Sequence, residues 1–319
     1  MAVQPQEIKL GTRRVTFPSE YLQQLEDSNH CLNDVNALHQ EMQTKGYLYL
    51  RGFHDREEVL QARLEVLKYL KSTSDDILSS KQPLEMGVLK QGCGVGCVPF
   101  MEGKNVISHA DPVRKVLEGP RPFEFFKNYF GGREVRTFDF KWLRAVHTEG
   151  FTGAHVDNVY MSRGSKELLT MWTPLGDITA DMGVLAMCEG SHRLPSFAKF
   201  QEKYGNLDVE AVGLKGTGWF TCDPYEITDK FGGQWKTTNF QAGDVMIFTM
   251  RTLHMSTVNL TNLARISCDT RWQPLADVAD PRYIGDFQTP GTKFGLYSTD
   301  ESKTTSDNTM EHYRIKWGF

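Results

Sequence analysis

The sequence predicts a mainly β fold with flanking helices, and two observations support this. From Val135 onward, short apolar stretches with strand-like patterns are separated by turns rich in Gly, Asp and Asn. Before Val135, apolar residues recur mostly at helical spacing. Many short strands joined by turns suit a closed or two-sheet architecture. We therefore expect a double-stranded β-helix core (a cupin-like jelly roll) with helices packed on one side.

The N-terminal part is expected to be mainly helical. Residues 31–45 carry apolar side chains at helical spacing. Residues 55–72 are predicted to form a longer amphipathic helix, with Asp55 as its N-cap. A second helical region at 111–132 is interrupted at Gly119–Pro122 and is closed by glycines.

The strands and the domain boundaries follow from the same patterns. The expected strands are 46–53, 135–146, 154–162, 167–175, 183–190, 243–250 and 264–274, with a short helix at 195–204. A chain of 319 residues can fold as one large domain. Within a single domain 1–319 we expect a mainly helical part at 1–134, the double-stranded β-helix at 135–275 and a C-terminal extension at 276–319.

The composition argues against nucleic-acid and membrane partners. The net charge is −4, and no basic run marks a surface for nucleic acid or lipid. No window approaches the roughly 20 apolar residues of a membrane span, and the N-terminus lacks the apolar core of a secretion signal. The C-terminus also lacks a peroxisomal ending. We therefore expect a cytoplasmic protein.

Three polar residues have the types and spacing of a metal site. His155 and Asp157 form an H-x-D pair, and His254 follows far along the chain. Residues i and i+2 of a β-strand point to the same face, so one strand could present His155 and Asp157 to one ion. Two imidazoles and a carboxylate form the facial triad that binds Fe(II) and leaves positions open. These ligands are compatible with Fe(II) but are not unique to it, and a lone H-x-D pair is usually incidental.

An arginine lies close after the second histidine. Between His254 and Arg265 there is room for a strand, a polar turn at Asn259–Asn262 and a return strand. We expect this hairpin to bring Arg265 beside the metal. A guanidinium at that place suits a co-substrate that carries a carboxylate, which indicates an iron enzyme that activates O₂ with 2-oxoglutarate.

From about Arg136 to Pro274 the chain resembles the phytanoyl-CoA dioxygenase family of Fe(II)/2-oxoglutarate oxygenases. Several segments match in order: FKWLRAV, AHVD, MWTPLGDIT, DMGVLAMCEGSHRLP, QAGDVMIFTMRTLHMSTVN and ARIS. Any one of these segments alone would be weak, but the ordered set is specific. The N-terminal third resembles the family only loosely, through KGYLYLRGF.

The resemblance implies a role for each matching position. It implies that iron is held by His155, Asp157 and His254, and that the 2-oxoglutarate site contains Arg265, Ser256, Trp172 and Arg144. Within that site, Arg265 would pair with the distal carboxylate and Ser256 would add a hydroxyl to it. One departure is Val156, where many members have Gln. Halogenating relatives lack the carboxylate at the position of Asp157, so its presence favours oxygenation.

The resemblance also implies the reaction, with Fe(II), 2-oxoglutarate and O₂ as metal and co-substrates. The expected outcome is hydroxylation of an unactivated C–H bond in a small molecule, with succinate and CO₂ as co-products. Asn158, Tyr160 and Arg271 are candidate substrate contacts. The basic side chains of Arg144 and Arg271 hint at an anionic substrate. Substrate identity and oligomeric state are not predicted by the sequence.

Two other function classes stay open at this point. A jelly-roll protein could bind or sense a ligand without catalysis, and a cupin-type protein with zinc or manganese could be a hydrolase or isomerase. Succinate formation separates the first alternative from an oxygenase, and O₂ dependence separates the second.

The cysteines add little to the functional prediction. The six are irregularly spaced in a chain of this length, so a disulfide framework is not expected. Cys93 and Cys97 flank a Gly-rich stretch that invites a zinc interpretation, but no second ligand pair accompanies them. An active-site loop or a plain connector is the favoured interpretation.

Overall fold

The computed structural model describes residues 4–91, 93, 106–285 and 308–319, and its centre is a pair of facing β-sheets. The larger sheet has the order β4-β10-β7-β12-β5, and β6 also pairs with β12. Its strands are β4 (Tyr47–Leu50), β10 (Val245–Thr249), β7 (Leu169–Pro174), β12 (Arg265–Pro274), β5 (Val135–Thr137) and β6 (Trp142–Val146).

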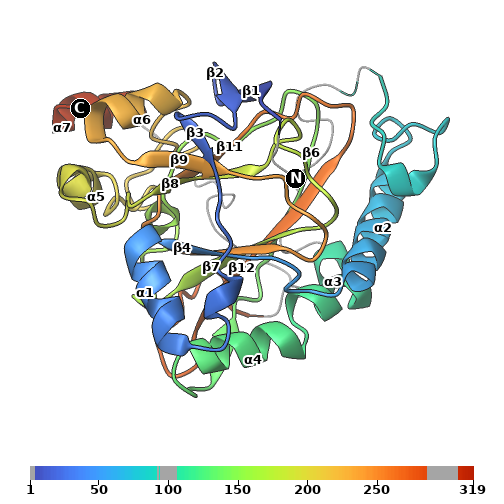
Figure 1. The fold of residues 1–319 in the computed structure, drawn as a ribbon, viewed down its shortest axis with the longest axis horizontal. Coiled ribbons are helices and arrows are strands. Elements are labelled where there is room, and N and C mark those ends of the chain that lie inside the picture. Colours follow the sequence, from blue (N-terminus) through green and yellow to red (C-terminus); the bar gives the residue numbers. More distant parts are fainter. Residues whose placement is uncertain (1–3, 92, 94–105, 286–307) are drawn as a thin grey trace.

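The smaller sheet has the order β11-β8-β9-β3 and lies above the larger one in Figure 1. Its strands are β11 (His254–Ser256), β8 (Leu185–Glu189), β9 (Gln234–Thr237) and β3 (Leu22–Gln24). A separate hairpin is formed by β1 (Gln6–Leu10) and β2 (Arg13–Phe17). The two facing sheets with flanking helices confirm the expected double-stranded β-helix.

Strand β12 organises the larger sheet because it pairs with β7, β6 and β5. All its residues are buried, and alternate side chains point to opposite faces. Ile266 and Cys268 pack outward in a hydrophobic cluster with helix residues. Arg265, Asp269 and Arg271 line interior cavities instead. The polar residues of this strand therefore belong to a site between the sheets.

Helices cover the outer face of the larger sheet (Figure 1). They are α1 (Val35–Lys45), α2 (Arg56–Thr73), α3 (Asp111–Leu117) and α4 (Pro120–Tyr129). The side chain of Asp55 accepts the amide N–H of Glu58 at 3.0 Å, which confirms the predicted cap of α2. Gly119 separates α3 from α4, where an added Cβ would lie 2.2 Å from the carbonyl oxygen of Lys115.

A second group of helices packs beside the smaller sheet. They are α5 (Ala198–Lys203), α6 (Pro224–Phe231) and α7 (Met310–Trp317). Phe200 and Phe231 from this group share a core cluster with Trp235 of β9. Short 3-10 turns occupy Asn29–Cys31, Leu84–Met86, Val106–His109, Asp157–Val159 and Pro195–Phe197.

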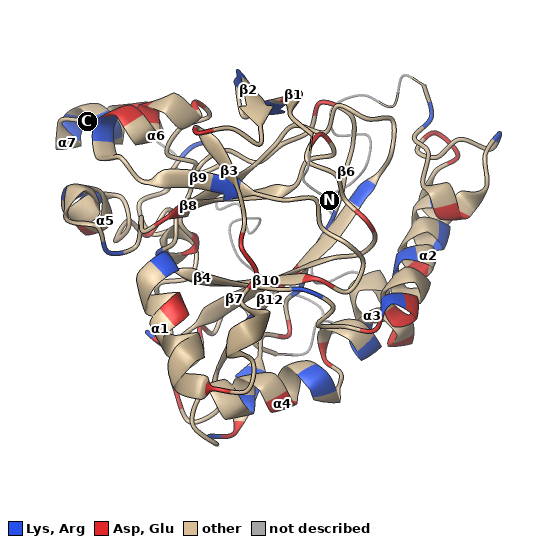
Figure 2. Ribbon diagram, in the orientation of Figure 1, with Lys and Arg blue, Asp and Glu red and all other residues tan. Residues whose placement is uncertain are grey.

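Positively and negatively charged side chains are mixed on the surface. Figure 2 shows Lys and Arg interspersed with Asp and Glu along the outer helices, and several of these groups pair, such as Arg114 with Glu118 at 2.9 Å. Among the described residues, no helix is both long and apolar enough to cross a membrane.

Most elements expected from the sequence are present, but one strand is not. The predicted strand 154–162 is instead an isolated bridge followed by a 3-10 turn. The part of the chain before residue 135 also contributes strands to the sheets, because β4 pairs with β10 and β3 pairs with β9. Each sheet of the core thus takes a strand from the N-terminal part.

Candidate metal centre and co-substrate site

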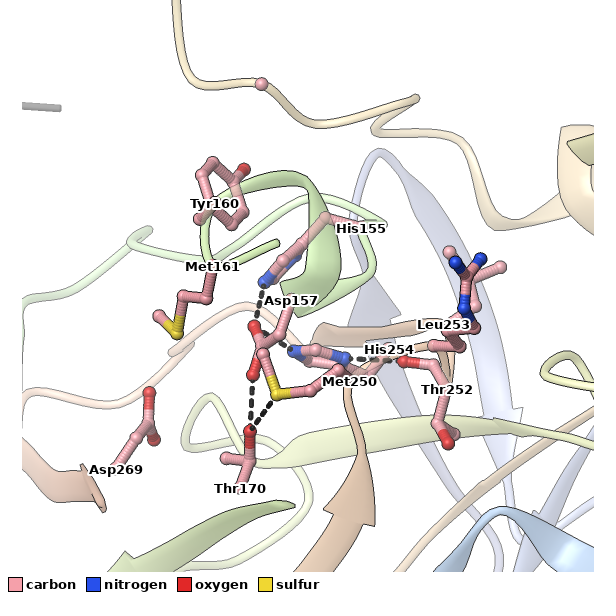
Figure 3. A network of polar contacts seen from close by, with 12 residues as sticks. His155, Asp157, Tyr160, Met161, Thr170, Met250, Thr252, Leu253, His254 and Asp269 are labelled. Atoms are coloured by element: carbon pink, nitrogen blue, oxygen red, sulfur yellow. Dashed lines mark hydrogen bonds and ion pairs between the residues drawn. The ribbon is translucent and has the colours of Figure 1, made fainter. Parts of the chain in front are cut away.

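Three buried side chains, His155, Asp157 and His254, meet in the interior (Figure 3). Their ligand atoms all lie within 4.8 Å of one another. Oδ1 of Asp157 is 3.6 Å from Nε2 of His155 and 3.7 Å from Nε2 of His254. The three residues predicted from the sequence therefore converge on one point.

The backbone brings the two histidines together directly. His155 and His254 form an isolated antiparallel bridge, with amide-to-carbonyl distances of 2.9 and 3.0 Å in the two directions. The chain then turns, and Asp157 begins the 3-10 turn Asp157–Val159. The prediction that His155 and Asp157 share a strand face is wrong. The bridge and the turn nevertheless aim both side chains at the same place.

Hydrogen bonds orient both imidazoles. Nδ1 of His155 lies 2.8 Å from the carbonyl oxygen of Gly153, and Nδ1 of His254 lies 3.0 Å from that of Thr252. A carbonyl only accepts, so Nδ1 carries the proton and Nε2 presents its lone pair to the centre. Burial, together with the neighbouring His155, lowers the pKa of His254 to about 4. The neutral form that a metal requires is therefore dominant near pH 7.

The carboxylate of Asp157 is held by two donors on its far oxygen. Oδ2 accepts hydrogen bonds from Oγ1 of Thr170 at 2.6 Å and from Nη2 of Arg271 at 2.9 Å. Burial opposes the charged form, but the positive guanidinium of Arg271 favours it, and the pKa of Asp157 lies well below its ordinary value. Asp157 is therefore ionised at neutral pH.

The donor set fits Fe(II). Two neutral imidazole nitrogens and one carboxylate oxygen form a compact group that is closed on one side by Thr170 and Arg271. This is the composition of the two-His-one-carboxylate centre, in which the remaining metal positions stay open to co-substrate and O₂.

A small cavity of about 30 Å³ extends from the triad toward Arg265. It is lined by Arg144, Thr152, His155, Trp172, Leu185, Phe248, His254, Met255, Ser256, Arg265 and Asp269. All four residues expected around 2-oxoglutarate are in this set. It shares Arg144, Thr152 and His155 with a larger cavity next to the triad.

Arg265 is a buried arginine that lines this cavity, and its Nη1 donates to Oγ of Ser267. It is 3 % exposed, and its Nε has no hydrogen-bond partner among the described residues. Burial and the nearby charge of Arg144 lower its pKa to about 9. Asp269, the neighbouring carboxylate, forms its ion pair with Arg144. A buried guanidinium with an unsatisfied N–H is suited to an incoming carboxylate.

Ser256 completes this end of the cavity. Its Oγ accepts the amide N–H of Thr152 at 2.8 Å, which leaves the hydroxyl proton for donation. The predicted hairpin between His254 and Arg265 is wrong, because β11 pairs with β8 in the smaller sheet and β12 belongs to the larger one. Ser256 and Arg265 therefore approach the same cavity from opposite sheets.

The larger cavity has a volume of about 530 Å³ and reaches His155 and Asp157. Its wall is rich in aromatic side chains: Phe140, Trp142, Phe151, Tyr160, Trp219 and Tyr283. Tyr160 therefore lies where the sequence placed it, and its hydroxyl donates to the carbonyl oxygen of Thr217 at 2.7 Å. Sequence reasoning missed the other aromatic residues, which come from separate segments.

Two candidate substrate residues are placed differently. Asn158 lines a different cavity, of about 620 Å³, and its Nδ2 donates to the carbonyl oxygen of Gly205 at 2.7 Å. Asn158 therefore does not line the cavity that borders His155 and Asp157. Arg271 borders the aromatic cavity, but its guanidinium is bound to Asp157.

Of the two cysteines that flank the Gly-rich stretch, Cys93 is disulfide-bonded, and Cys97 lies outside the described residues.

Comparison with known families agrees with this geometry. The family model "Phytanoyl-CoA dioxygenase (PhyH)" matches residues 42–267, which is most of the chain and includes His155, Asp157, His254 and Arg265. The chain belongs to this family. The match begins at residue 42, so the family likeness reaches further toward the N-terminus than Arg136.

Individual relatives of this phytanoyl-CoA dioxygenase family member are distant. The 1-deoxypentalenic acid 11-beta-hydroxylase of Streptomyces exfoliatus is 25 % identical over 269 residues, covering 78 % of this chain and 84 % of that protein. Solved structures share the fold. The non-haem α-ketoglutarate-dependent epimerase SnoN has a TM-score of 0.52 at 19 % identity, covering 82 % of this chain and 91 % of its own. The carbocyclase SnoK has a TM-score of 0.52 at 14 % identity, covering 83 % and 89 %.

Membership of this family establishes the reaction class. The protein is a 2-oxoglutarate-dependent non-haem iron dioxygenase, and it uses Fe(II), 2-oxoglutarate and O₂. A structure of SnoN contains Fe³⁺, α-ketoglutarate and nogalamycin RO. A family of iron-dependent oxygenases leaves no room for the non-catalytic binding protein or the zinc or manganese hydrolase considered from the sequence.

Proposed function

We propose that this dioxygenase hydroxylates an unactivated C–H bond of a ring-sized, largely apolar molecule held in the aromatic cavity. The observation that carries the proposal is the cavity of about 530 Å³ that borders both His155 and Asp157. A substrate inside it lies against the open side of the metal centre. Aromatic side chains around a cavity bury a large apolar area of the ligand, which contributes much of the binding free energy. Their rigid rings also select ligands that fit the shape of the cavity.

The protein's own side chains have separate tasks in this reaction. His155, Asp157 and His254 would hold Fe(II), while Arg265 and Ser256 would bind the distal carboxylate of 2-oxoglutarate. When bound, the iron with 2-oxoglutarate and O₂ supplies the oxidising power for oxygen insertion and releases succinate and CO₂. The aromatic wall would position the C–H bond and exclude water from it.

The basic side chains favour an uncharged substrate more than an anionic one. Arg144 forms an ion pair with Asp269, and Arg271 forms one with Asp157 at 2.9 Å. Both arginines that hinted at an anion already have carboxylate partners. The buried part of the substrate is therefore expected to be apolar and neutral.

Hydroxylation is favoured over other oxidative outcomes by two observations. The carboxylate of Asp157 stands at the proposed metal centre, which favours oxygenation over halogenation, and the 25 %-identical relative is named as a hydroxylase. The fold alone does not select the outcome, since SnoN is described as an epimerase and SnoK as a carbocyclase.

The experiment that tests this proposal compares ligand classes. The protein with Fe(II) and 2-oxoglutarate is given a neutral bicyclic terpenoid alcohol, the carboxylic acid of the same skeleton, and a long-chain acyl-CoA thioester. We expect the neutral compound to stimulate succinate formation most and to gain one oxygen atom, measured by mass spectrometry. Stimulation by the acyl-CoA thioester alone would contradict the proposed substrate class.

A variant of the cavity wall gives a prediction for substrate binding. Trp219 lines the cavity beside Phe151, with ring centroids 6.1 Å apart. Trp219→Ala should raise the substrate KM about tenfold to a hundredfold, because burial of a large apolar side chain contributes about 1.5–3 kcal/mol. The KM for 2-oxoglutarate should stay unchanged. Trp317→Ala on α7, outside the cavity, is the matched control, and an equal effect of both variants would refute the role of Trp219.

A further inference from the structure

We infer that Thr170 and Arg271 form a clamp that restricts Asp157 to a single metal-binding oxygen. The inference rests on the proposed assignment of His155, Asp157 and His254 as metal ligands. In this account Thr170 and Arg271 are positioning residues: they act on the metal through the carboxylate and do not touch it themselves.

The geometry divides the two carboxylate oxygens of Asp157 between different tasks. Oδ1 faces the imidazoles, 3.6 Å from Nε2 of His155 and 3.7 Å from Nε2 of His254. Oδ2 receives two donors, Oγ1 of Thr170 at 2.6 Å and Nη2 of Arg271 at 2.9 Å. A carboxylate oxygen has about two lone-pair sites, so both sites of Oδ2 are used. An ion placed between the imidazoles therefore meets only Oδ1.

The clamp is built into the larger sheet. Thr170 of β7 and Arg271 of β12 are direct cross-strand partners, so one register position delivers both donors. Because β12 pairs with β7 along most of its length, the two donors have a fixed separation. Thr170 is fully buried and Arg271 is 1 % exposed, so both donors reach Oδ2 from within the protein interior, where hydrogen bonds are strong.

The guanidinium of Arg271 is fixed on its other sides as well. Its Cζ lies 4.5 Å from the ring centroid of Trp142, and its Nε lies 3.2 Å from Sδ of Met161. A second carboxylate, that of Asp269, is 4.0 Å from Nη2, compared with 2.9 Å for Asp157. A buried cation is tolerated when it is paired and packed in this way, and Asp157 is the nearer partner.

The consequence concerns the metal positions that stay open. A facial triad works because protein atoms occupy one face and co-substrate and O₂ take the rest. If Asp157 bound through both oxygens, it would occupy one of those remaining positions. Arg271 also places a positive charge behind the carboxylate, which weakens the attraction of the site for a divalent ion. The clamp thus keeps metal positions free for co-substrate and O₂, and it lowers the affinity of the site for the metal.

The test uses Mn(II) binding to the protein without 2-oxoglutarate, and its readouts are metal affinity and water-proton relaxation per bound ion. Relaxation reports the exchangeable water on the metal. In Arg271→Met we expect lower relaxation per bound Mn(II), because the second oxygen of Asp157 displaces water. We also expect binding about tenfold tighter, because the repelling cation is gone. Thr170→Val should change both quantities in the same direction and by less.

Matched variants separate the clamp from general damage. Arg271→Lys and Thr170→Ser keep a donor and should stay near the wild type. Arg63→Met removes another buried arginine, whose hydrogen bonds within the described part of the chain go to backbone carbonyls such as that of Leu175 at 3.2 Å, and should leave both readouts unchanged. Wild-type relaxation in Arg271→Met, or equal changes in Arg271→Met and Arg63→Met, would overturn the inference.

If Arg271→Met does not fold, Thr170→Val decides the question alone, and wild-type relaxation in that variant would overturn the clamp. The metal assignment fails in a different way. Absence of Mn(II) binding in the wild-type protein would refute the ligands themselves and with them the clamp. Failure of the proposed hydroxylation would leave the Mn(II) result intact, so the two accounts are tested separately.

Discussion

His254→Ala is expected to abolish iron-dependent succinate formation while the protein stays folded. His254 would supply one of the three proposed ligand atoms, and the hydrogen bond from its Nδ1 to the carbonyl oxygen of Thr252 leaves Nε2 facing the centre. Without it the site keeps one imidazole and one carboxylate, which is too few for tight Fe(II) binding. An open metal site contributes modestly to the stability of a domain this large, so the thermal unfolding temperature of the metal-free protein should change little.

Asp157→Ala is expected to abolish the same activity with an added cost in stability. The substitution leaves the buried guanidinium of Arg271 without its nearest carboxylate, and breaking such a pair typically costs about 3–5 kcal/mol. We therefore expect a lower thermal unfolding temperature for Asp157→Ala than for His254→Ala. Succinate formation and iron content are measured for both variants, and wild-type turnover in both would show that the metal assignment is wrong.

Arg265→Ala should raise the KM for 2-oxoglutarate by at least about two orders of magnitude. The guanidinium is fully buried and has an N–H without a partner among the described residues, which suits the distal carboxylate. Losing one partner of a buried charged pair costs about 3–5 kcal/mol, and each ~1.4 kcal/mol is a factor of ten. Ser256→Ala should cost about 1 kcal/mol, as expected for a single hydrogen bond. Fe(II) affinity should be nearly unchanged in both.

The control for this prediction is the second arginine of β12. Arg271 bonds Asp157, so Arg271→Ala should act mainly on metal binding and raise the 2-oxoglutarate KM by less than Arg265→Ala does. Steady-state titrations of 2-oxoglutarate with the two variants decide between them. A large KM effect confined to Arg271→Ala would show that the anchor was assigned to the wrong residue.

The residue types at the site were predictable because they carry chemistry that few other combinations provide. His155, Asp157, His254 and Arg265 stand in family-like segments, and the structure brings all four to adjoining cavities. Helix α2 was predictable for a local reason, since its apolar spacing and its cap at Asp55 lie within one short segment.

What the sequence did not reveal depends on long-range pairing. Alternation around Asp157 resembles a strand, but the local partner of His155 is a one-residue bridge to His254. The joint action of Thr170 and Arg271 depends on the register between β7 and β12, and neither segment's own sequence indicates that register. The aromatic cavity likewise combines side chains from distant segments, so its apolar character was visible only in the fold.

The central claim is that the buried triad binds Fe(II) together with 2-oxoglutarate. The most direct measurement is an anaerobic titration of the wild-type protein and His254→Ala with Fe(II) and 2-oxoglutarate, followed by visible absorption. We expect a weak charge-transfer band that saturates at equimolar Fe(II) in the wild-type protein, and no such band in His254→Ala. A wild-type protein without the band, or a variant that develops the same band, would contradict it.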